Sequence, residues 1–295
     1  MGTHAHLTAR MQNIERMKPQ AKKKLKLDEI GEWSELKLDI LKKYAGAYCT
    51  ILKARNLHPV YIDAFAGAGT HIRKGTNELV LGSPLNALRV QPPFDALHLI
   101  DLDQTKVAEL KRHTHGLKHV HVYGGNANEI LISEVFPKIR FENFERALCI
   151  LDPYALHLDW GVIETAGQTG ITEIVLNFPI LDMNRNVLLW NPENASEEDV
   201  ERMNAFWGDQ SWRDIAYSRT QNLFGWPEKQ PNEVIAEAFR ERLKKVAGFK
   251  YVPEPVPMRN SKSAILYYLF FAAQKETAEN IVVDILDKYR REGAL

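Results

Sequence analysis

The chain has 295 residues, of which 45% are hydrophobic and 26% are charged, and its 38 lysines and arginines equal its 38 aspartates and glutamates. This length and composition are typical of one large globular domain, and they exclude a disordered chain, a collagen-like repeat and a disulfide-rich miniprotein. The balanced charge also excludes a protein that binds nucleic acid through a uniformly basic surface.

Two further features bear on location. No stretch reaches the ~18 consecutive apolar residues of a membrane helix, and residues 1–10 contain no apolar run that would indicate a secretory signal. Cys49 and Cys149 lie far apart and match no zinc spacing. We therefore expect a cytoplasmic protein that has no disulfide framework, spans no membrane and holds no metal.

Positive charge is concentrated near the N-terminus. Residues 10–26 contain seven basic side chains (Arg10, Arg16, Lys18, Lys22, Lys23, Lys24 and Lys26) and one acidic side chain, Glu15. Such a run is typical of a solvated tail, and it is also suited to an arm that contacts phosphates in a salt-dependent way. Both interpretations stay open.

Strand-like and helix-like segments alternate through the first 180 residues, which is typical of an α/β fold with a parallel sheet. Helical spacing of apolar residues predicts a helix over 33–53. Ser83 as N-cap and Pro84 as first helical residue predict the start of another helix that runs through Leu88. A further helix is expected over 105–113. The pattern predicts five strands, largely apolar on both faces, over 60–65, 96–100, 119–123, 147–151 and 171–178.

The pattern changes after Pro179. Residues 181 to about 247 predict helices without a strand and contain Trp190, Trp207, Trp212 and Trp226. These aromatics either form a small core for the insertion or stack on the bases of a substrate. Two closing strands are expected over 249–258 and 264–272, followed by a helix over 277–291.

The most informative segment is a glycine turn that follows the first strand. It contains Asp63, Phe65, Gly67 and Gly69. Glycines let a ligand approach the backbone closely, but a dinucleotide-binding fingerprint would require a third glycine where Ile72 stands. A strand carboxylate before the turn suits a ligand with a cationic amine. The pattern resembles motif I of class I methyltransferases, which bind S-adenosylmethionine.

Polar residues also follow the next three predicted strands, and carboxyl ends of parallel strands gather at one edge of a sheet. By the same resemblance, Asp101 is expected to bind the ribose hydroxyls, and Asn126 with Ala127 to lie beside the adenine. Asp152, Pro153 and Tyr154 occupy the place of the catalytic motif in methyltransferases that act on exocyclic amino groups.

Several motifs together carry a closer resemblance. The segments Glu32-Trp33-Ser34-Glu35-Leu36-Lys37, 61–69, Gly82-Ser83-Pro84-Leu85, Ile100-Asp101-Leu102-Asp103 and Leu151-Asp152-Pro153-Tyr154 are similar to those of three-Cys-motif partner proteins. The layout also resembles ribosomal RNA adenine-N6 methyltransferases of the YhiR type, and Asp-Pro-Tyr resembles the motif of tRNA guanine-N2 methyltransferases. The resemblance implies S-adenosylmethionine as cofactor, a neighbouring cysteine-motif protein as a partner, and contact of Lys37 with the cofactor's carboxylate. For Lys37, a solvated side chain is the alternative.

The catalytic motif departs from the usual Asn/Asp-Pro-Pro-aromatic form, because Tyr154 comes one residue early. In that motif the acid and a backbone carbonyl hold the target amino group, and the aromatic ring stacks on the base. Trp160 is a separate candidate for a pocket wall. The histidines around His119 and His121 are interpreted as surface side chains rather than metal ligands.

We therefore expect one methyltransferase-like domain over 1–295, with a basic lead-in over 1–30 and a helical insertion over about 181–247. Its fold would be a Rossmann-like class I methyltransferase sheet of about seven mostly parallel strands, the last antiparallel. The expected function is methylation of a nucleobase amino group in RNA or DNA. The alternatives are a non-catalytic S-adenosylmethionine-binding partner of a cysteine-motif protein, and a small-molecule or protein methyltransferase. The sequence leaves the oligomeric state open.

Overall fold

The structure is a computed structural model that describes residues 27–221, 223, 225–260 and 262–291. The basic run over 10–26 lies outside these residues. Within the described part of the chain, no helix is both long enough and apolar enough to cross a membrane.

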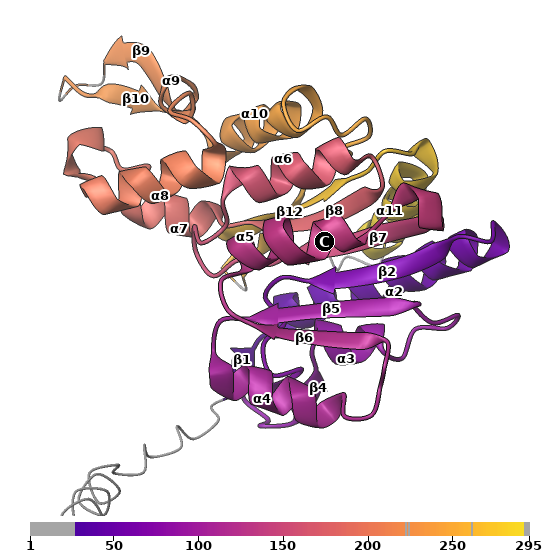
Figure 1. The fold of residues 1–295 in the computed structure, drawn as a ribbon. Coiled ribbons are helices and arrows are strands. Elements are labelled where there is room, and N and C mark those ends of the chain that lie inside the picture. The colour runs from indigo at the N-terminus through magenta and orange to yellow at the C-terminus, as the bar shows by residue number, and fades with distance from the viewer. Residues whose placement is uncertain (1–26, 222, 224, 261, 292–295) are drawn as a thin grey trace, which may run out of the picture.

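The centre of the molecule is a seven-stranded sheet with the strand order β11-β12-β8-β7-β2-β5-β6 (Figure 1). The five strands from β8 to β6 are parallel, and β12 is antiparallel to both β8 and β11. The predicted sheet is thus confirmed. Its strands are β2 (His58–Asp63), β5 (Ala96–Asp101), β6 (Val120–Gly124), β7 (Glu145–Leu151), β8 (Thr172–Phe178), β11 (Val256–Arg259) and β12 (Ile265–Ala272).

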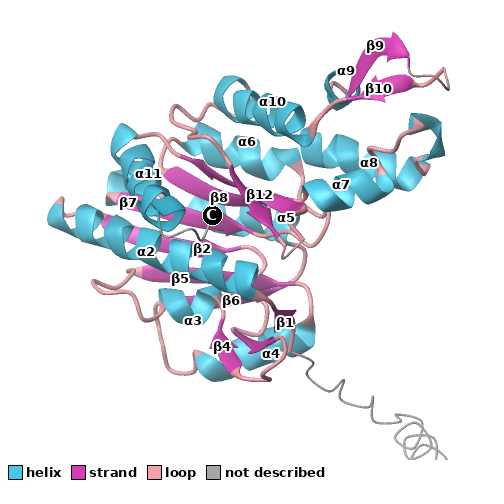
Figure 2. Ribbon diagram, turned by 180° about the vertical axis from the view of Figure 1, so that it is seen from behind, coloured by secondary structure: helices cyan, strands magenta, loops and turns pink. Residues whose placement is uncertain are grey.

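Helices cover both faces of this sheet. One face is covered by α2 (Glu32–Ala54), α3 (Ser83–Ala87), α4 (Gln104–His113) and α11 (Glu276–Arg291), as Figure 2 shows for α2, α3 and α11. The other is covered by α5 (Ala127–Ile130), α6 (Trp160–Thr169) and α10 (Asn232–Lys245) (Figure 1). Two apolar cores result, one on each side of the sheet.

The edge strand β6 differs from the prediction that every strand is apolar on both faces. His121 and Gly124 are exposed, and Val122 is only partly buried. The reason is position, because β6 pairs with β5 alone and forms one edge of the sheet. The central strand β2, by contrast, is buried from Pro59 to Asp63.

The glycine turn leads into a strand rather than directly toward a helix. β3 (Thr70–Arg73) pairs antiparallel with β4 (Leu79–Leu81) and parallel with β1 (Glu29–Ile30), which together form a small second sheet. Ser83 is not the helix N-cap that the sequence predicts, because Gly82 takes that place. The Ser83 side chain instead hydrogen-bonds Asp63.

The insertion contains the predicted helices but also a hairpin that the sequence analysis missed. Its helices are α7 (Ile180–Asn186), α8 (Glu197–Trp207), α9 (Trp212–Ala216) and α10. Strands β9 (Tyr217–Gln221) and β10 (Pro227–Lys229) pair antiparallel and project from the end of the molecule (Figure 1). The prediction of an insertion without strands was wrong, because these short polar segments have little strand pattern.

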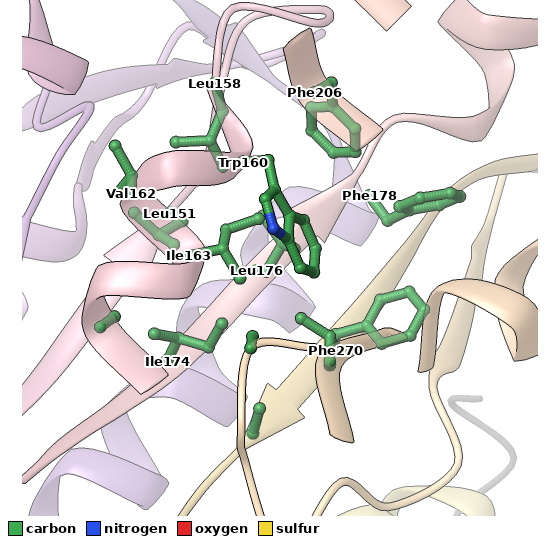
Figure 3. Close-up of a cluster of buried hydrophobic side chains, with 14 of the residues drawn as sticks. Leu151, Leu158, Trp160, Val162, Ile163, Ile174, Leu176, Phe178, Phe206 and Phe270 are labelled. Carbon is green, nitrogen blue, oxygen red and sulfur yellow. The ribbon is translucent and has the colours of Figure 1, made fainter. Parts of the chain in front are cut away.

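Aromatic side chains join the insertion to the sheet. Phe206 of α8 and Phe239 of α10 stack at 5.6 Å between ring centroids, and both pack on Phe178 of β8. Figure 3 shows Phe206 and Phe178 in one cluster with Phe270 and Trp160. Most of the insertion's buried aromatics therefore extend the core of the sheet instead of building a separate one.

The tryptophans of the insertion differ in burial. Trp207 and Trp212 are buried, whereas Trp190 is 72% exposed. Trp160 is also buried, between Phe239 and the Arg242 guanidinium, so it does not form the cavity wall that the sequence analysis considered.

Candidate functional site

A cavity of about 1420 Å³ opens at the carboxyl ends of the parallel strands. Single ligands usually occupy pockets of about 300–1000 Å³, so this cavity has room for a nucleoside-sized ligand and a second group. The structure brings most of the predicted site residues to its wall. Those are Phe65, Gly67, Asp101, Asn126, Ala127, Asp152, Pro153 and Tyr154, whereas Lys37, Asp63 and Gly69 lie outside the lining.

The two glycines of the turn have different roles. Both have a positive φ, 64° at Gly67 and 83° at Gly69. A Cβ on Gly67 would meet nothing within 4 Å, whereas one on Gly69 would lie 3.1 Å from Leu85 Cγ. Gly67 therefore keeps the cavity wall open, and Gly69 allows the turn to pack on α3.

Asp101 ends β5 and ties the glycine turn to the next loop. Its carboxylate accepts hydrogen bonds from the backbone N–H of Gly67 at 2.8 Å and of Asp103 at 2.8 Å. Each carboxylate oxygen has two acceptor sites, so Asp101 can still accept bonds from a ligand. Asn126 is exposed at the rim and caps α5, since its Oδ1 accepts from Asn128 N at 3.0 Å.

Asp63 is buried beneath the turn, with 1% of its surface exposed. It accepts hydrogen bonds from Phe65 N at 3.3 Å and from the Tyr61 hydroxyl at 3.2 Å, and Ser83 also binds it. Burial raises the pKa of Asp63 to about 6, and the nearby Asp152 acts in the same direction against these hydrogen bonds. Direct contact between Asp63 and a cofactor amine stays a prediction, because Asp63 does not line the cavity.

The Lys37 ammonium forms an ion pair with Asp152, 115 residues away in sequence. The side chains are 11% and 35% exposed, respectively. Burial by itself would lower the pKa of Lys37, but the charge and hydrogen bond of Asp152, together with Tyr267 and Asp63, outweigh it and the pKa is raised. Lys37 thus binds the predicted catalytic acid in this structure, where the sequence analysis expected it to contact the cofactor's carboxylate.

Asn177 completes this arrangement, and the sequence analysis missed it. It lies near the end of β8, lines the cavity and donates from Nδ2 to Asp152 Oδ1 at 2.7 Å. The rule that selected Asp101 and Asn126, a polar residue where a parallel strand ends, also applies to Asn177 and could have found it.

The outer part of the cavity combines an exposed aromatic ring with the insertion. Tyr154 is 84% exposed at the wall, whereas Pro153 beside it is buried. Helices α7 and α8 supply residues that no motif indicated, namely Leu181, Asp182, Arg185, Arg202 and Ala205. The insertion therefore contributes charged side chains to the cavity, and its buried tryptophans do not reach it.

His98 on β5 and His121 on β6 lie outside the cavity lining, which contains His71 and His157 instead. His121 is exposed and stacks on the buried His98 at 5.0 Å between ring centroids. Burial lowers the pKa of His98 to about 4. Over the part of the chain that the structure describes, no group of three or more His, Cys, Asp and Glu side chains could hold a metal ion.

No protein-family model matches this chain, and no curated protein matches it. Membership of the three-Cys-motif partner family therefore stays a prediction. Among solved structures, the chain is similar to a Legionella pneumophila protein of the family model DUF519, with 12% identity and a TM-score of 0.51. The match covers 85% of this chain and 92% of that one.

Two methyltransferase structures also match, at lower scores. The N-methyltransferase NodS from Bradyrhizobium japonicum, in complex with S-adenosyl-L-homocysteine, has 12% identity, a TM-score of 0.41 and coverage of 83% and 89% of the two chains. The methyltransferase domain of bacterial CtHen1 has 12% identity, a TM-score of 0.38 and coverage of 79% and 99%. The similarity to the Legionella protein shows a shared fold. The strand order of the central sheet, with β12 antiparallel, is that of the Rossmann-like class I methyltransferase sheet.

Proposed function

We propose that this protein is an S-adenosylmethionine-dependent methyltransferase that acts on an amino group of a nucleobase in RNA or DNA. One observation carries the proposal: a single cavity joins the open wall at Gly67 and the carboxylate of Asp101 to the Asp152-Pro153-Tyr154 segment. A cofactor on one side and an acceptor on the other would meet inside it.

The residues present fit the cofactor. The open backbone at Gly67 admits a ligand close to the turn, and Asp101 has acceptor sites left for two ribose hydroxyls. When bound, S-adenosylmethionine supplies an electrophilic methyl group on a positively charged sulfur. Asn126 and Ala127 would line the adenine side, and Asp63 would add negative charge beneath the turn.

In this proposal Asp152 orients the acceptor. β7 lies directly beside β2 in the sheet, so Asp152 lies next to the glycine turn. Its carboxylate accepts hydrogen bonds and can hold an amino group with the nitrogen lone pair directed at the methyl group. The exposed Tyr154 ring offers a surface on which a base can stack.

Two substitutions test the proposal. Asp101→Ala should weaken S-adenosylmethionine binding by about 1–3 kcal/mol, because the ribose hydroxyls lose a charged acceptor. Asp152→Ala should leave that affinity within a few-fold and lower kcat about a hundredfold or more, because it removes a preorganised group that acts in the transition state. Calorimetry gives the affinities, and labelled cofactor with separated RNA and DNA pools gives the activity. Full activity in a folded Asp152→Ala variant would contradict the assigned role.

One observation favours a second candidate, a non-catalytic S-adenosylmethionine-binding partner of a cysteine-motif protein. Both oxygens of Asp152 already have protein partners, Lys37 and Asn177, and Tyr154 stands one residue early in the motif. Cofactor binding without transfer to RNA, DNA or metabolite pools would favour this candidate. Loss of nucleic-acid activity after removal of residues 1–26, together with strong salt dependence, would favour the enzyme.

A further inference from the structure

The Asn177 side chain has one amide atom that is paired and one that is not. Its Nδ2 donates to Asp152, but its Oδ1 is buried without a hydrogen-bond partner among the described residues. A buried polar atom left unpaired destabilises a protein, and few such atoms remain in native structures. Asn177 lines the cavity, so a ligand in the cavity can supply the missing donor.

The orientation of this amide is set by its neighbours. Asp152 is paired with the Lys37 ammonium, and an ionised carboxylate only accepts hydrogen bonds. The NH2 group of Asn177 must therefore face Asp152, which leaves the carbonyl oxygen on the other side of the amide. The backbone of Asn177 is fixed as well, because β8 lies between β7 and β12 and Asn177 pairs with Leu269.

We propose that Asn177 is a specificity-determining residue whose Oδ1 accepts one N–H of the acceptor's amino group while Asp152 accepts the other. This inference rests on the proposed function and deepens it, since it specifies an unsubstituted NH2 group as the acceptor. A hydroxyl or a ring N–H offers a single hydrogen and would leave one of the two acceptors unpaired.

The proposal also predicts the product. The acceptor nitrogen forms a bond to the methyl carbon as the bond from that carbon to sulfur breaks, and the electron pair of the broken bond stays on sulfur. The nitrogen then loses one proton to water. The product amine keeps a single N–H, so it cannot pair with both Asp152 and Asn177. We therefore expect one methyl group per amino group.

The experiment compares Asn177→Ala with a matched control, Asn184→Ala. Asn184 of α7 likewise donates from Nδ2, to Asn232 Oδ1 at 2.9 Å, and likewise has a buried Oδ1 without a partner in the described structure. It does not line the cavity. Each variant is incubated with labelled S-adenosylmethionine and total RNA or genomic DNA, and the nucleosides are analysed by mass spectrometry. The isolated monomethylated product is then offered as a second substrate.

Wild type and Asn184→Ala should give only monomethylated nucleosides. Asn177→Ala should lose at least tenfold in kcat/KM for the unmodified acceptor, and its preference for NH2 over NHCH3 should fall at least tenfold. Its affinity for S-adenosyl-L-homocysteine, measured by calorimetry, should stay within twofold. A variant that only misplaces Asp152 would slow methyl transfer to the NH2 and the NHCH3 acceptors by the same factor.

Such an equal loss, or wild-type activity in Asn177→Ala, would overturn the inference and leave the proposed function standing. Dimethylation by the wild type at a comparable rate would also overturn it. If the wild type transfers no methyl group to RNA or DNA, the proposed function fails, and the inference fails with it.

Discussion

Replacing Asp63 by asparagine should make the protein more stable at neutral pH. Burial raises the pKa of Asp63 to about 6, from 3.8 in the unfolded chain. Because the folded pKa is the higher one, the native state favours the protonated acid, and its stability falls as pH rises from about 4 to about 6. A shift of about two units corresponds to about 3 kcal/mol, and with 1% exposure solvent screens little of it.

Asparagine removes this cost because it carries no charge. Its amide oxygen can still accept from Phe65 N, and its NH2 group can donate to the Tyr61 hydroxyl. Allowing for imperfect hydrogen bonds, we expect Asp63→Asn to be about 1–3 kcal/mol more stable than wild type at pH 7.5 and equal to it near pH 4. The variant should also bind S-adenosylmethionine more weakly, as stabilising changes in binding sites often do.

Urea unfolding at the two pH values measures the difference, with equal m-values as the condition for comparison. Asp159→Asn is the matched control, since Asp159 is an exposed aspartate among the residues that line the cavity. This substitution should leave the free energy of unfolding unchanged at both pH values. The reasoning would be refuted if the Asp63→Asn variant were less stable than wild type at pH 7.5, or if the difference in free energy of unfolding between the two proteins did not change with pH.

The two glycines of the turn should respond differently to alanine. Gly67→Ala should cost about 1–2 kcal/mol of stability because of its positive φ, and it should weaken cofactor binding at least tenfold in calorimetry. Gly69→Ala should lower the melting temperature more than Gly67→Ala, because its Cβ would also meet Leu85. Equal melting temperatures would contradict this assignment. Lys37→Met should lower the free energy of unfolding at pH 7 by about 2–3 kcal/mol, less than breaking a fully buried ion pair would, because Asp152 is partly exposed. A double-mutant cycle with Asp152→Asn should show coupling between the two residues in urea unfolding. Additive effects would show that the pair contributes little.

Local patterns were sufficient to predict the central sheet. The five parallel strands are short, largely apolar runs; β2 and β5 end at aspartates, β6 ends at a glycine, and Asp152 follows β7. Short apolar runs bounded by turn residues favour buried strands. The carboxyl ends of parallel strands meet at one edge, so Asp101, Asn126 and Asp152 could be predicted at one cavity from their order alone.

The short strands could not be predicted in this way. β3 and β4 have 4 and 3 residues, and β9 and β10 have 5 and 3. Segments of this length carry too few side chains to show a two-residue period, and each becomes a strand because a partner pairs with it. The partial exposure of β6 could not be predicted either, because it results from the place of β6 at the edge of the sheet and not from its own sequence pattern.

The sequence by itself thus determined the fold class and which residues gather where the parallel strands end, because these depend on local patterns and on the direction of the strands. Only the tertiary structure decided how those residues are paired. It paired Lys37 with Asp152, buried Asp63 beneath the glycine turn and set the Asn177 amide beside Asp152. Such pairings join residues far apart in the chain, and burial sets their energies. Neither the pairings nor their energies can be predicted from the spacing of neighbouring residues.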